Sequence, residues 1–229
     1  MGFEKLGFLD GCARCRHRAD HAFCNLPPEA LRRLDEISYA VTYPQRVTLF
    51  SEDQPCRGVF ILCEGKAKVT ASRGGKPLML RIAAAGEVLG LSAAMSGGNY
   101  ELTAETLARS TVRFIKRDDF LYLLHESSDA LSNVLQILSL EYQQVIESLR
   151  NLGLRNTATA RVAQLLLNIC AEETSARFLL TQEQIAQMTA TTRETVTRLM
   201  VQLRKAQVIS IRGSSLTIRV RTALERMAC

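Results

Sequence analysis

The sequence predicts an α+β fold built from a small β-roll, one long helix and a C-terminal pair of helices with a hairpin. Three patterns support this prediction: short β-rich runs between glycines, a three- and four-residue apolar repeat in the middle, and two capped helices near the end. We expect four segments: 1–26 with clustered cysteines, 27–125 as the roll, 126–153 as the long helix, and 154–229 as the C-terminal domain.

Composition limits the class of protein. The chain has 229 residues, of which 47% are hydrophobic, so two domains with cores of their own are expected. No apolar stretch is as long as a membrane span, and the N-terminus has no continuous apolar signal segment, so we expect a cytoplasmic protein with no membrane partner. The 7 cysteines are then expected to be thiols or metal ligands rather than structural disulfides.

The roll is predicted from about Tyr39 to Arg117, where short β-rich runs alternate with glycine turns. The main strand candidates are Val47–Phe50, Val59–Leu62, Ala67–Thr70, Leu78–Ile82 and Thr111–Ile115. Regular short strands with glycine turns are typical of a β-barrel or β-roll.

A helical stretch is predicted from Asp118 to about Gly153. Its apolar residues recur at steps of three and four: Leu131, Val134, Leu135, Leu138, Tyr142, Val145, Ile146 and Leu149. A long helix with one apolar stripe between two domains is typical of a dimer seam. The alternative is that the stripe packs wholly within its own chain.

Two short helices with capping signals follow near the C-terminus. Thr181–Gln184 has the form of a capping box, and Thr191–Glu194 has the same form, so each should open a helix. The first helix has a partly apolar inner face at Ile185, Met188 and Thr189. The second should face a core with Val196, Leu199, Met200 and Leu203.

The opposite face of the second helix carries Arg193, Glu194, Thr197 and Arg198. Arg can bind guanine with two hydrogen bonds, Glu can accept from the cytosine amino group, and Thr offers a hydroxyl and a methyl. These residues lie in the first two turns, where a recognition helix meets bases in the major groove. The pattern therefore predicts a DNA-reading helix-turn-helix, and the alternative is an ordinary solvated helix face.

A wing is predicted after this helix. Val208–Ile211 and Leu216–Val220 should form two strands around the turn from Arg212 to Ser215. Arg212, Ser214 and Ser215 are candidates for phosphate contacts, and a surface turn without contacts is the alternative.

The charge of the chain is asymmetric. Between Arg155 and Cys229 there are 11 Lys and Arg but 5 Asp and Glu, so this segment carries the whole formal charge of +6. A basic segment around a helix-turn-helix is typical of a polyanion binder, and it predicts salt-sensitive affinity through counterion release from phosphates.

This order of parts resembles the Crp–Fnr superfamily of bacterial transcription regulators. The resemblance depends on Gly58–Gly65, Ala85–Gly90 and, most specifically, Thr192–Arg198. It implies a homodimer whose roll senses a signal, whose two recognition helices read a palindrome with TGA-containing half-sites, and whose partners include RNA polymerase. Thr181, Thr192 and Arg212 complete the expected DNA contacts. Ala190 stands where the family usually has Gly, and a left-handed conformation there would cost of order 1 kcal/mol.

The resemblance also bears on cyclic nucleotides. Members that bind cyclic AMP hold its ribose with a carboxylate after the glycine that matches Gly90, and its phosphate with an arginine. Here Leu91 and Ser92 follow the glycine, and Glu101 lies at the phosphate position, where it would repel an anion. The sequence therefore argues against cyclic AMP. The alternatives are a cyclic-nucleotide-gated regulator or another ligand in the same roll, held by Ser92, Tyr100 or Thr103.

The N-terminal cysteines suggest a second kind of sensor. Cys12, Cys15 and Cys24 form C-x2-C-x8-C, which suits an iron–sulfur cluster or zinc. Nearby Arg14, Arg16 and Arg18 are expected to lower the thiol pKa values. This segment resembles that of the Fnr branch, in which three N-terminal cysteines and one in the roll hold a [4Fe-4S] cluster that senses gas or redox state.

The fourth ligand departs from that pattern, because Arg113 lies where the family has cysteine. Cys56 or Cys63 could replace it, as could His17 or His21. Three interpretations stay open: a [4Fe-4S] cluster, a zinc site of three cysteines and a histidine, or no metal with redox-active or structural thiols.

An enzyme is not indicated. The chain has 3 histidines, and none belongs to a nucleophile or metalloprotease motif. The sequence also has no phosphate loop of the P-loop or dinucleotide type.

Overall fold

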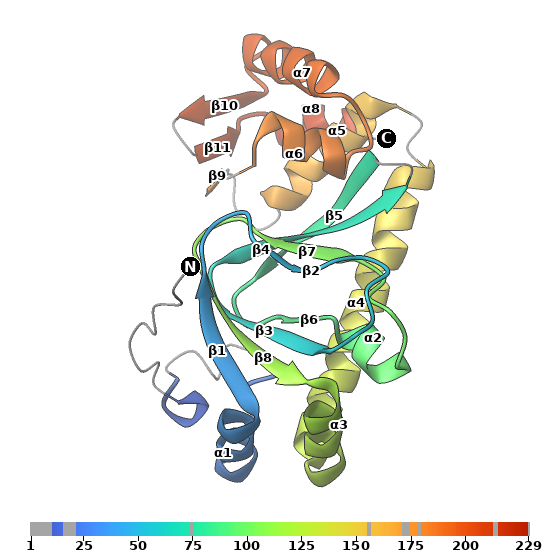
Figure 1. Ribbon diagram of the computed structural model, residues 1–229. Coiled ribbons are helices and arrows are strands. Elements are labelled where there is room, and N and C mark those ends of the chain that lie inside the picture. The colour runs from blue at the N-terminus through green and yellow to red at the C-terminus, as the bar shows by residue number, and fades with distance from the viewer. Residues whose placement is uncertain are drawn as a thin grey trace. The chain divides into compact units, whose positions relative to one another are not determined.

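The computed structural model describes residues 11–15, 22–73, 76–154, 157–170, 175–177, 180–212 and 215–228 (Figure 1). The chain divides into two compact units, Met1–Tyr142 and Gln143–Cys229. The expected α+β class is confirmed.

The first unit is a roll of two antiparallel sheets (Figure 1). One sheet has the order β1-β8-β3-β6 and the other has the order β2-β7-β4-β5. The strands are β1 (Ser38–Tyr43), β2 (Thr48–Phe50), β3 (Gly58–Glu64), β4 (Lys66–Arg73), β5 (Lys76–Ala84), β6 (Val88–Leu89), β7 (Thr103–Thr106) and β8 (Ser110–Lys116). All five strand candidates are confirmed, while β1, β6 and β7 were not among them; β6 has two residues and β7 is largely polar.

Aromatic side chains fill the space between the two sheets. The ring of Phe50 stacks on the ring of Tyr100 with centroids 4.2 Å apart, and the ring centroids of Phe60 and Phe114 are 4.9 Å apart. The Tyr100 hydroxyl donates to the Gly58 carbonyl at 2.7 Å, which satisfies its polar end inside the core.

The helices that begin in this unit are α1 (Pro28–Ile37), α2 (Leu91–Ser96), α3 (Arg117–Glu126) and α4 (Ser128–Leu154), with a 3₁₀ turn η1 (Cys12–Arg14); α4 continues past the boundary at Tyr142. The single helical stretch predicted from Asp118 to Gly153 is wrong in one respect. Ser127 is extended, with φ −123° and ψ 105°, and its backbone ends α3 and starts α4. Five polar residues, His125–Asp129, interrupt the apolar repeat at this point, and the Ser127 Oγ accepts from the Ala130 backbone N–H at 3.2 Å, so the capping signal was present in the sequence but was not used.

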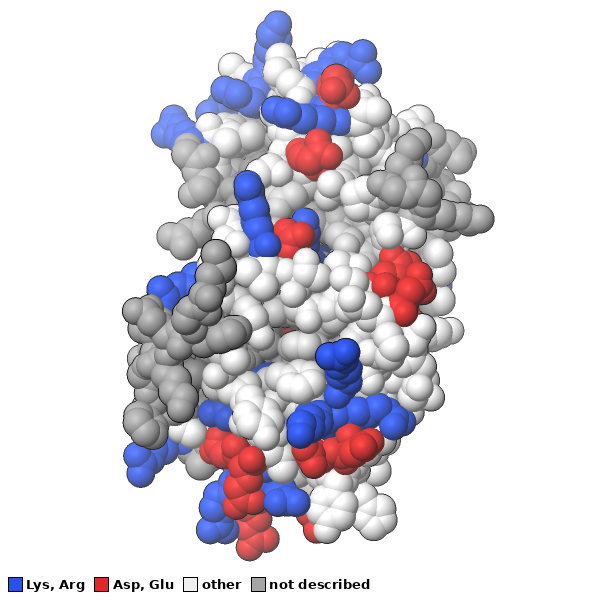
Figure 2. Space-filling view, viewed as in Figure 1, with Lys and Arg blue, Asp and Glu red and all other residues white. Residues whose placement is uncertain are grey.

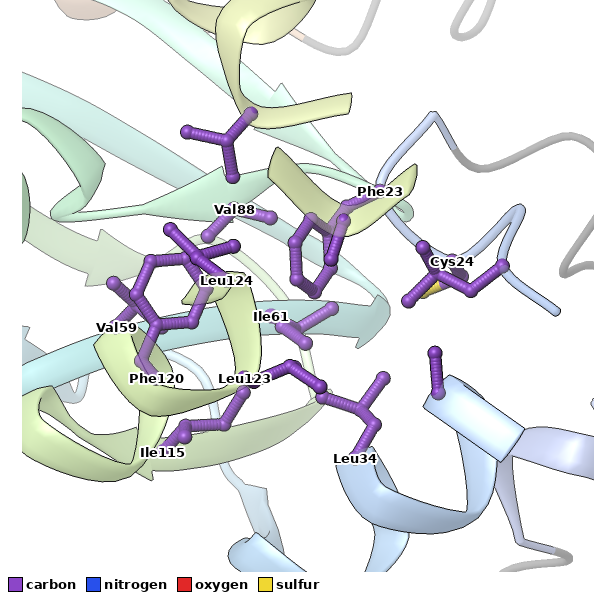
Figure 3. Packing of buried hydrophobic residues seen from close by; sticks show 14 of the residues in the cluster. Phe23, Cys24, Leu34, Val59, Ile61, Val88, Ile115, Phe120, Leu123 and Leu124 are labelled. Carbon is purple, nitrogen blue, oxygen red and sulfur yellow. The ribbon is translucent and has the colours of Figure 1, made fainter. Parts of the chain in front are cut away.

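A second core joins these helices to the outer face of the roll. Figure 3 shows Phe23, from the N-terminal segment, pointing into a cluster with Ile61 and Phe120, while Cys24 lies beside it. The Phe23 and Phe120 ring centroids are 5.8 Å apart, and both side chains are fully buried. Strand β3 serves both cores, because Val59 and Ile61 face the helices while Phe60 and Leu62 face the roll interior.

Helix α4 has two apolar faces. Val134 is fully buried, and Ile137 and Leu138 pack against the same core. Other large apolar side chains of α4 are 39–67% exposed: Leu131, Leu135, Leu140, Tyr142, Val145 and Leu149. The predicted single stripe is therefore divided between the core of its own chain and an uncovered surface.

The second unit contains α5 (Ala158–Ile169), β9 (Ser175–Arg177), α6 (Gln182–Met188), α7 (Arg193–Lys205), β10 (Ile209–Arg212), β11 (Ser215–Ile218) and α8 (Arg221–Ala228). The strands form one antiparallel sheet in the order β10-β11-β9, so the predicted hairpin is confirmed. Strand β9 and helix α8 were not predicted from the sequence. No helix in the described residues is long and apolar enough to span a membrane.

Candidate nucleic-acid interface and sensor sites

Helix α6 begins at the predicted capping box. The Thr181 Oγ1 accepts from the Gln184 backbone N–H at 3.2 Å, and the Gln184 Oε1 accepts from the Thr181 N–H at 2.8 Å. Two backbone N–H groups that a helix start leaves unpaired are thus satisfied.

The turn between α6 and α7 contains a left-handed residue. Ala190 has φ +47°, as expected at the position where the family has glycine. Arg161, from α5, stabilises this turn: its Nε donates to the Thr189 carbonyl at 2.7 Å and its Nη2 to the Ala190 carbonyl at 3.3 Å. Sequence patterns did not predict this role of Arg161, which lies 28 residues before Thr189.

Helix α7 begins one residue later than the predicted Thr191–Glu194 box, so that prediction is wrong. The Thr191 N–H donates to the Ala186 carbonyl at 3.0 Å, which keeps Thr191 in the turn. Thr192 is the N-cap instead, and its Oγ1 accepts from the Thr195 N–H at 3.3 Å.

The two faces of α7 differ as expected. Val196, Met200 and Leu203 are buried, and Leu199 packs partly against the same core. Arg193, Glu194 and Arg198 are exposed in the first two turns. Within the described part of the chain, no salt bridge involves the Arg198 guanidinium. The helix therefore presents two cations and a carboxylate at its N-terminal end.

Two of the expected base-reading residues have partners inside the protein. The Thr197 Oγ1 lies 2.5 Å from the Gln182 Oε1 and 2.9 Å from the Arg193 carbonyl, so its single proton serves one of these acceptors at a time. The hydroxyl thus links α7 to α6. Hydrogen bonds from its own backbone N–H and from the Thr192 hydroxyl hold the pKa of Glu194 below its usual value, so Glu194 is an ionised acceptor.

The wing and its surroundings are basic. Arg212 is exposed at the end of β10, while Gly213 and Ser214 lie outside the described residues and Ser215 begins β11. In Figure 2, Lys and Arg side chains gather over the second unit, around α7 and β10, with few acidic residues among them. The exposed cations of α7, the wing strands and α8 are Arg193, Arg198, Arg204, Lys205, Arg212, Arg219, Arg221 and Arg226.

The side chains considered for a ligand in the roll bind each other or the backbone. The Ser92 Oγ donates to Glu101 Oε1 at 2.9 Å, and the Thr103 Oγ1 accepts from the Glu52 N–H at 2.9 Å. Tyr100 is buried and bonded to Gly58. Glu101 also lies near Glu141 of α4, whose pKa is raised by burial and by Glu87 and Glu101, against the opposing effect of Arg81.

The cysteine segment folds against the roll. Cys12 and Cys24 are buried in the second core, with Cys56 and Cys63 packed against it, while Cys15 is half-buried. Burial raises the pKa of Cys12 and raises that of Cys24 to about 12. The expectation that Arg14, Arg16 and Arg18 lower these pKa values is therefore wrong for both thiols, because desolvation is the largest effect. Arg16 and Arg18 lie outside the described residues.

Arg113 lies among these thiols. Its Nη1 is 3.0 Å from the Asp35 Oδ1 and donates to the Ser38 Oγ at 2.7 Å. The same Asp35 oxygen accepts from the Cys12 N–H at 2.7 Å. Arg113 opposes the rise in pKa at Cys12, Cys24 and Cys63. This is a buried guanidinium whose charge is balanced by one carboxylate.

The potential metal-binding side chains do not surround a common point. Among the residues that the structure describes, no three His, Cys, Asp or Glu side chains lie close enough together to hold one metal ion. Cys12, Cys15 and Cys24 are all described, so they do not form a single-ion site as they lie. His17 and His21, named as alternative ligands, are outside the described residues.

Comparison with known proteins gives two family matches. A family model described as the Crp-like helix-turn-helix domain matches residues 160–227, and one described as the cyclic nucleotide-binding domain matches residues 40–127. A CRP-like cAMP-activated global transcriptional regulator of Mycobacterium tuberculosis is 24% identical over 214 residues, which cover 90% of this chain and 95% of that protein.

Solved structures share the fold. FixK2 from Bradyrhizobium japonicum has a TM-score of 0.73 at 22% identity, over 84% of this chain and 98% of that one. A CooA mutant from Carboxydothermus hydrogenoformans has a TM-score of 0.73 at 17% identity, over 85% of this chain and 89% of that one.

Proposed function

Because the chain belongs to the Crp–Fnr superfamily of transcription regulators, we propose that it binds a palindromic DNA operator as a homodimer and reads it with α7. Its relatives are regulators rather than enzymes, and the chain combines a helix-turn-helix with a cyclic-nucleotide-binding-like domain. The resemblance further suggests TGA-containing half-sites and contact with RNA polymerase.

One observation supports DNA reading most directly. Helix α7 buries Val196, Met200 and Leu203, which fixes its rotation, and this leaves Arg193 and Arg198 exposed in its first two turns. A recognition helix contacts bases with these turns. The capped starts of α6 and α7, at Thr181 and Thr192, are suited to phosphate contacts, because helix N-termini favour anions.

The α4 surface supports the homodimer. Leu131, Leu135, Leu138, Tyr142, Val145 and Leu149 follow each other at steps of four and three, which is the spacing of a coiled-coil seam. Five of these six are well exposed in a single chain. Since contiguous exposed apolar surface marks an interaction site, a second copy of α4 is the occupant that the heptad spacing fits. Two-fold symmetry then places the recognition helices one DNA turn apart, ~34 Å.

We further propose that cyclic AMP is not the effector. The resemblance puts Glu101 at the phosphate position, where it accepts from Ser92, and both Glu101 and Glu87 raise the pKa of Glu141. Three carboxylates against one guanidinium, that of Arg81, disfavour a phosphate there. The alternative, a cyclic-nucleotide-gated regulator, is favoured if calorimetry detects cyclic AMP binding at micromolar concentration.

The test of DNA reading is selection of operators from random duplexes, followed by anisotropy titrations. Arg198→Ala should weaken the selected operator by about 1–3 kcal/mol and relax one base position. Lys205→Ala removes the same charge about 10 Å further along the helix and is the control. The control should weaken all sequences alike. Uniform weakening by Arg198→Ala would mean that Arg198 contacts only phosphate.

A further inference from the structure

Arg81 reaches from the roll to the long helix α4. The pairing of β5 with β4 shifts by one residue at Leu80, next to Arg81. Such a bulge bends a strand and re-aims the side chains beside it. The Arg81 Nη2 donates to the Glu141 Oε1 of α4 at 2.9 Å, across 60 residues of sequence. The roll and α4 are therefore joined by a direct ion pair.

The same guanidinium also holds the turn that follows β5. The Arg81 Nη1 donates to the Glu87 Oε2. Glu87 is itself fixed, because its Oε1 accepts from the Ala84 backbone N–H at 2.7 Å. The planar guanidinium thus serves two carboxylates from different parts of the chain, which a single ammonium group would not do with the same geometry. The side chains of Arg81 and Glu141 are 24% and 31% exposed, so water screens the pair only in part.

Arg81 lies between carboxylates that repel one another. The pKa of Glu141 is raised first by burial and then by two carboxylates of the roll, Glu87 and Glu101. The Arg81 guanidinium opposes this rise. Without Arg81, the negative charges of the roll would repel the negative charge of α4. One side chain therefore changes the interaction between the roll and α4 from repulsion to attraction.

The pair fixes a position rather than adding stability. Burial raises the pKa of Glu141 more than Arg81 lowers it, so the charged form of Glu141 costs folding free energy. A partly buried ion pair that does not stabilise the fold still favours one geometry over others. Glu141 precedes Tyr142 and lies three residues after Leu138, and both neighbours belong to the apolar stripe of α4. The geometry that the pair favours is thus that of the surface proposed for the dimer.

We propose that Arg81 is a positioning residue, a built-in tie by which the roll holds α4 in the operator-binding arrangement without a bound small molecule. The polar groups named above already bind one another: Arg81 uses both terminal nitrogens, and Glu101 accepts from the Ser92 hydroxyl at 2.9 Å. The effect on the operator rests on the proposed function, whereas the tie itself does not depend on DNA.

The test compares Arg81→Met with a matched variant, Lys68→Met. Lys68 also pairs with a carboxylate, that of Glu105 at 2.9 Å, and its side chain is 26% exposed. Lys68 and Glu105 lie opposite each other on adjacent strands of one sheet. Each variant removes one cation of the roll and keeps an unbranched apolar side chain, and the contact that Arg81→Met removes reaches α4. Circular dichroism and sedimentation check the folding and assembly of both.

Hydrogen exchange measured by mass spectrometry tests the tie without DNA. Arg81→Met should lower the protection of α4 peptides that contain Glu141 by roughly tenfold, and Lys68→Met should leave it unchanged. In a Glu141→Ala background, Arg81→Met should cause no further loss in α4, because the partner is already gone. Equal protection in the wild type and Arg81→Met, or an equal loss in Lys68→Met, would overturn the proposal.

Operator binding tests the positioning. Wild-type protein that mass spectrometry shows to be free of nucleotide is titrated with the selected operator by anisotropy, with and without cyclic AMP or cyclic GMP. We expect binding without nucleotide, and we expect Arg81→Met to bind roughly tenfold more weakly than Lys68→Met. Binding that requires a nucleotide, or equal affinities of the two variants, would overturn the proposal. A wild type that selects no operator would refute the proposed function, while the exchange of α4 would still decide whether the tie exists.

Discussion

Replacing Arg161 with Met should loosen the recognition helix while keeping most of the aliphatic side chain. The bond from Arg161 Nε to the Thr189 carbonyl is 2.7 Å long and reaches a buried residue, and the bond to Ala190 is longer and exposed. A hydrogen bond from a charged group contributes about 1.5–3 kcal/mol, and an exposed one contributes less. We therefore expect a loss of about 2–3 kcal/mol from the local stability of α6 and α7.

Hydrogen exchange measured by mass spectrometry reports this local stability directly. A loss of about 2 kcal/mol should lower the protection of peptides from α6 and α7 by roughly 30-fold. Arg226→Met is the matched control, because Arg226 is exposed and, among the residues that the structure describes, donates only to the Thr222 carbonyl of its own helix at 3.3 Å. Unchanged protection in Arg161→Met, or an equal loss in the control, would refute the argument that this guanidinium holds the turn.

Three further predictions follow from particular residues. Ala190→Gly should raise the stability of the second unit by up to ~1 kcal/mol in thermal unfolding, because φ +47° strains alanine; a loss of stability would contradict this. Leu135→Glu should yield a monomer in sedimentation equilibrium while Gln136→Glu stays dimeric, since only Leu135 lies on the exposed stripe; equal behaviour would argue against the seam. Burial raises the pKa of Glu141 more than Arg81 lowers it, so ionisation of Glu141 opposes folding and the penalty grows as pH rises through the raised pKa. The Tm of Glu141→Gln minus the Tm of the wild type should accordingly increase between about pH 4 and about pH 7. A Tm difference that decreases over this range would contradict the predicted sign.

Local patterns predicted the parts of the site that depend on near neighbours. The Thr181 box involves residues three apart, and the buried face of α7 follows from helical spacing, so both were visible in the sequence. The left-handed Ala190 was predicted through the family resemblance.

Distant contacts were not predictable in the same way. Arg161 meets the turn only after α5 packs, and the neighbourhood of Cys63 and Arg113 depends on the register between β3 and β8. The break at Ser127 is different, because the polar run His125–Asp129 and the Ser127 cap are local signals that the sequence analysis did not use. Pairing across a sheet and packing between helices are tertiary properties, and the spacing of residues along one segment does not contain them.

The double burial of β3 restricts how this protein can evolve. Gly58 to Leu62 are all buried, with side chains alternating between two cores, so this run has no solvent-facing position where substitutions would be neutral. Tolerated substitutions in this run are limited to hydrophobic residues of similar side-chain volume. Cys63 is the first residue beyond this run and is only half-buried. It still packs against the helix-side core, so Glu64, which is exposed, is the first position of the strand where a substitution leaves both cores intact.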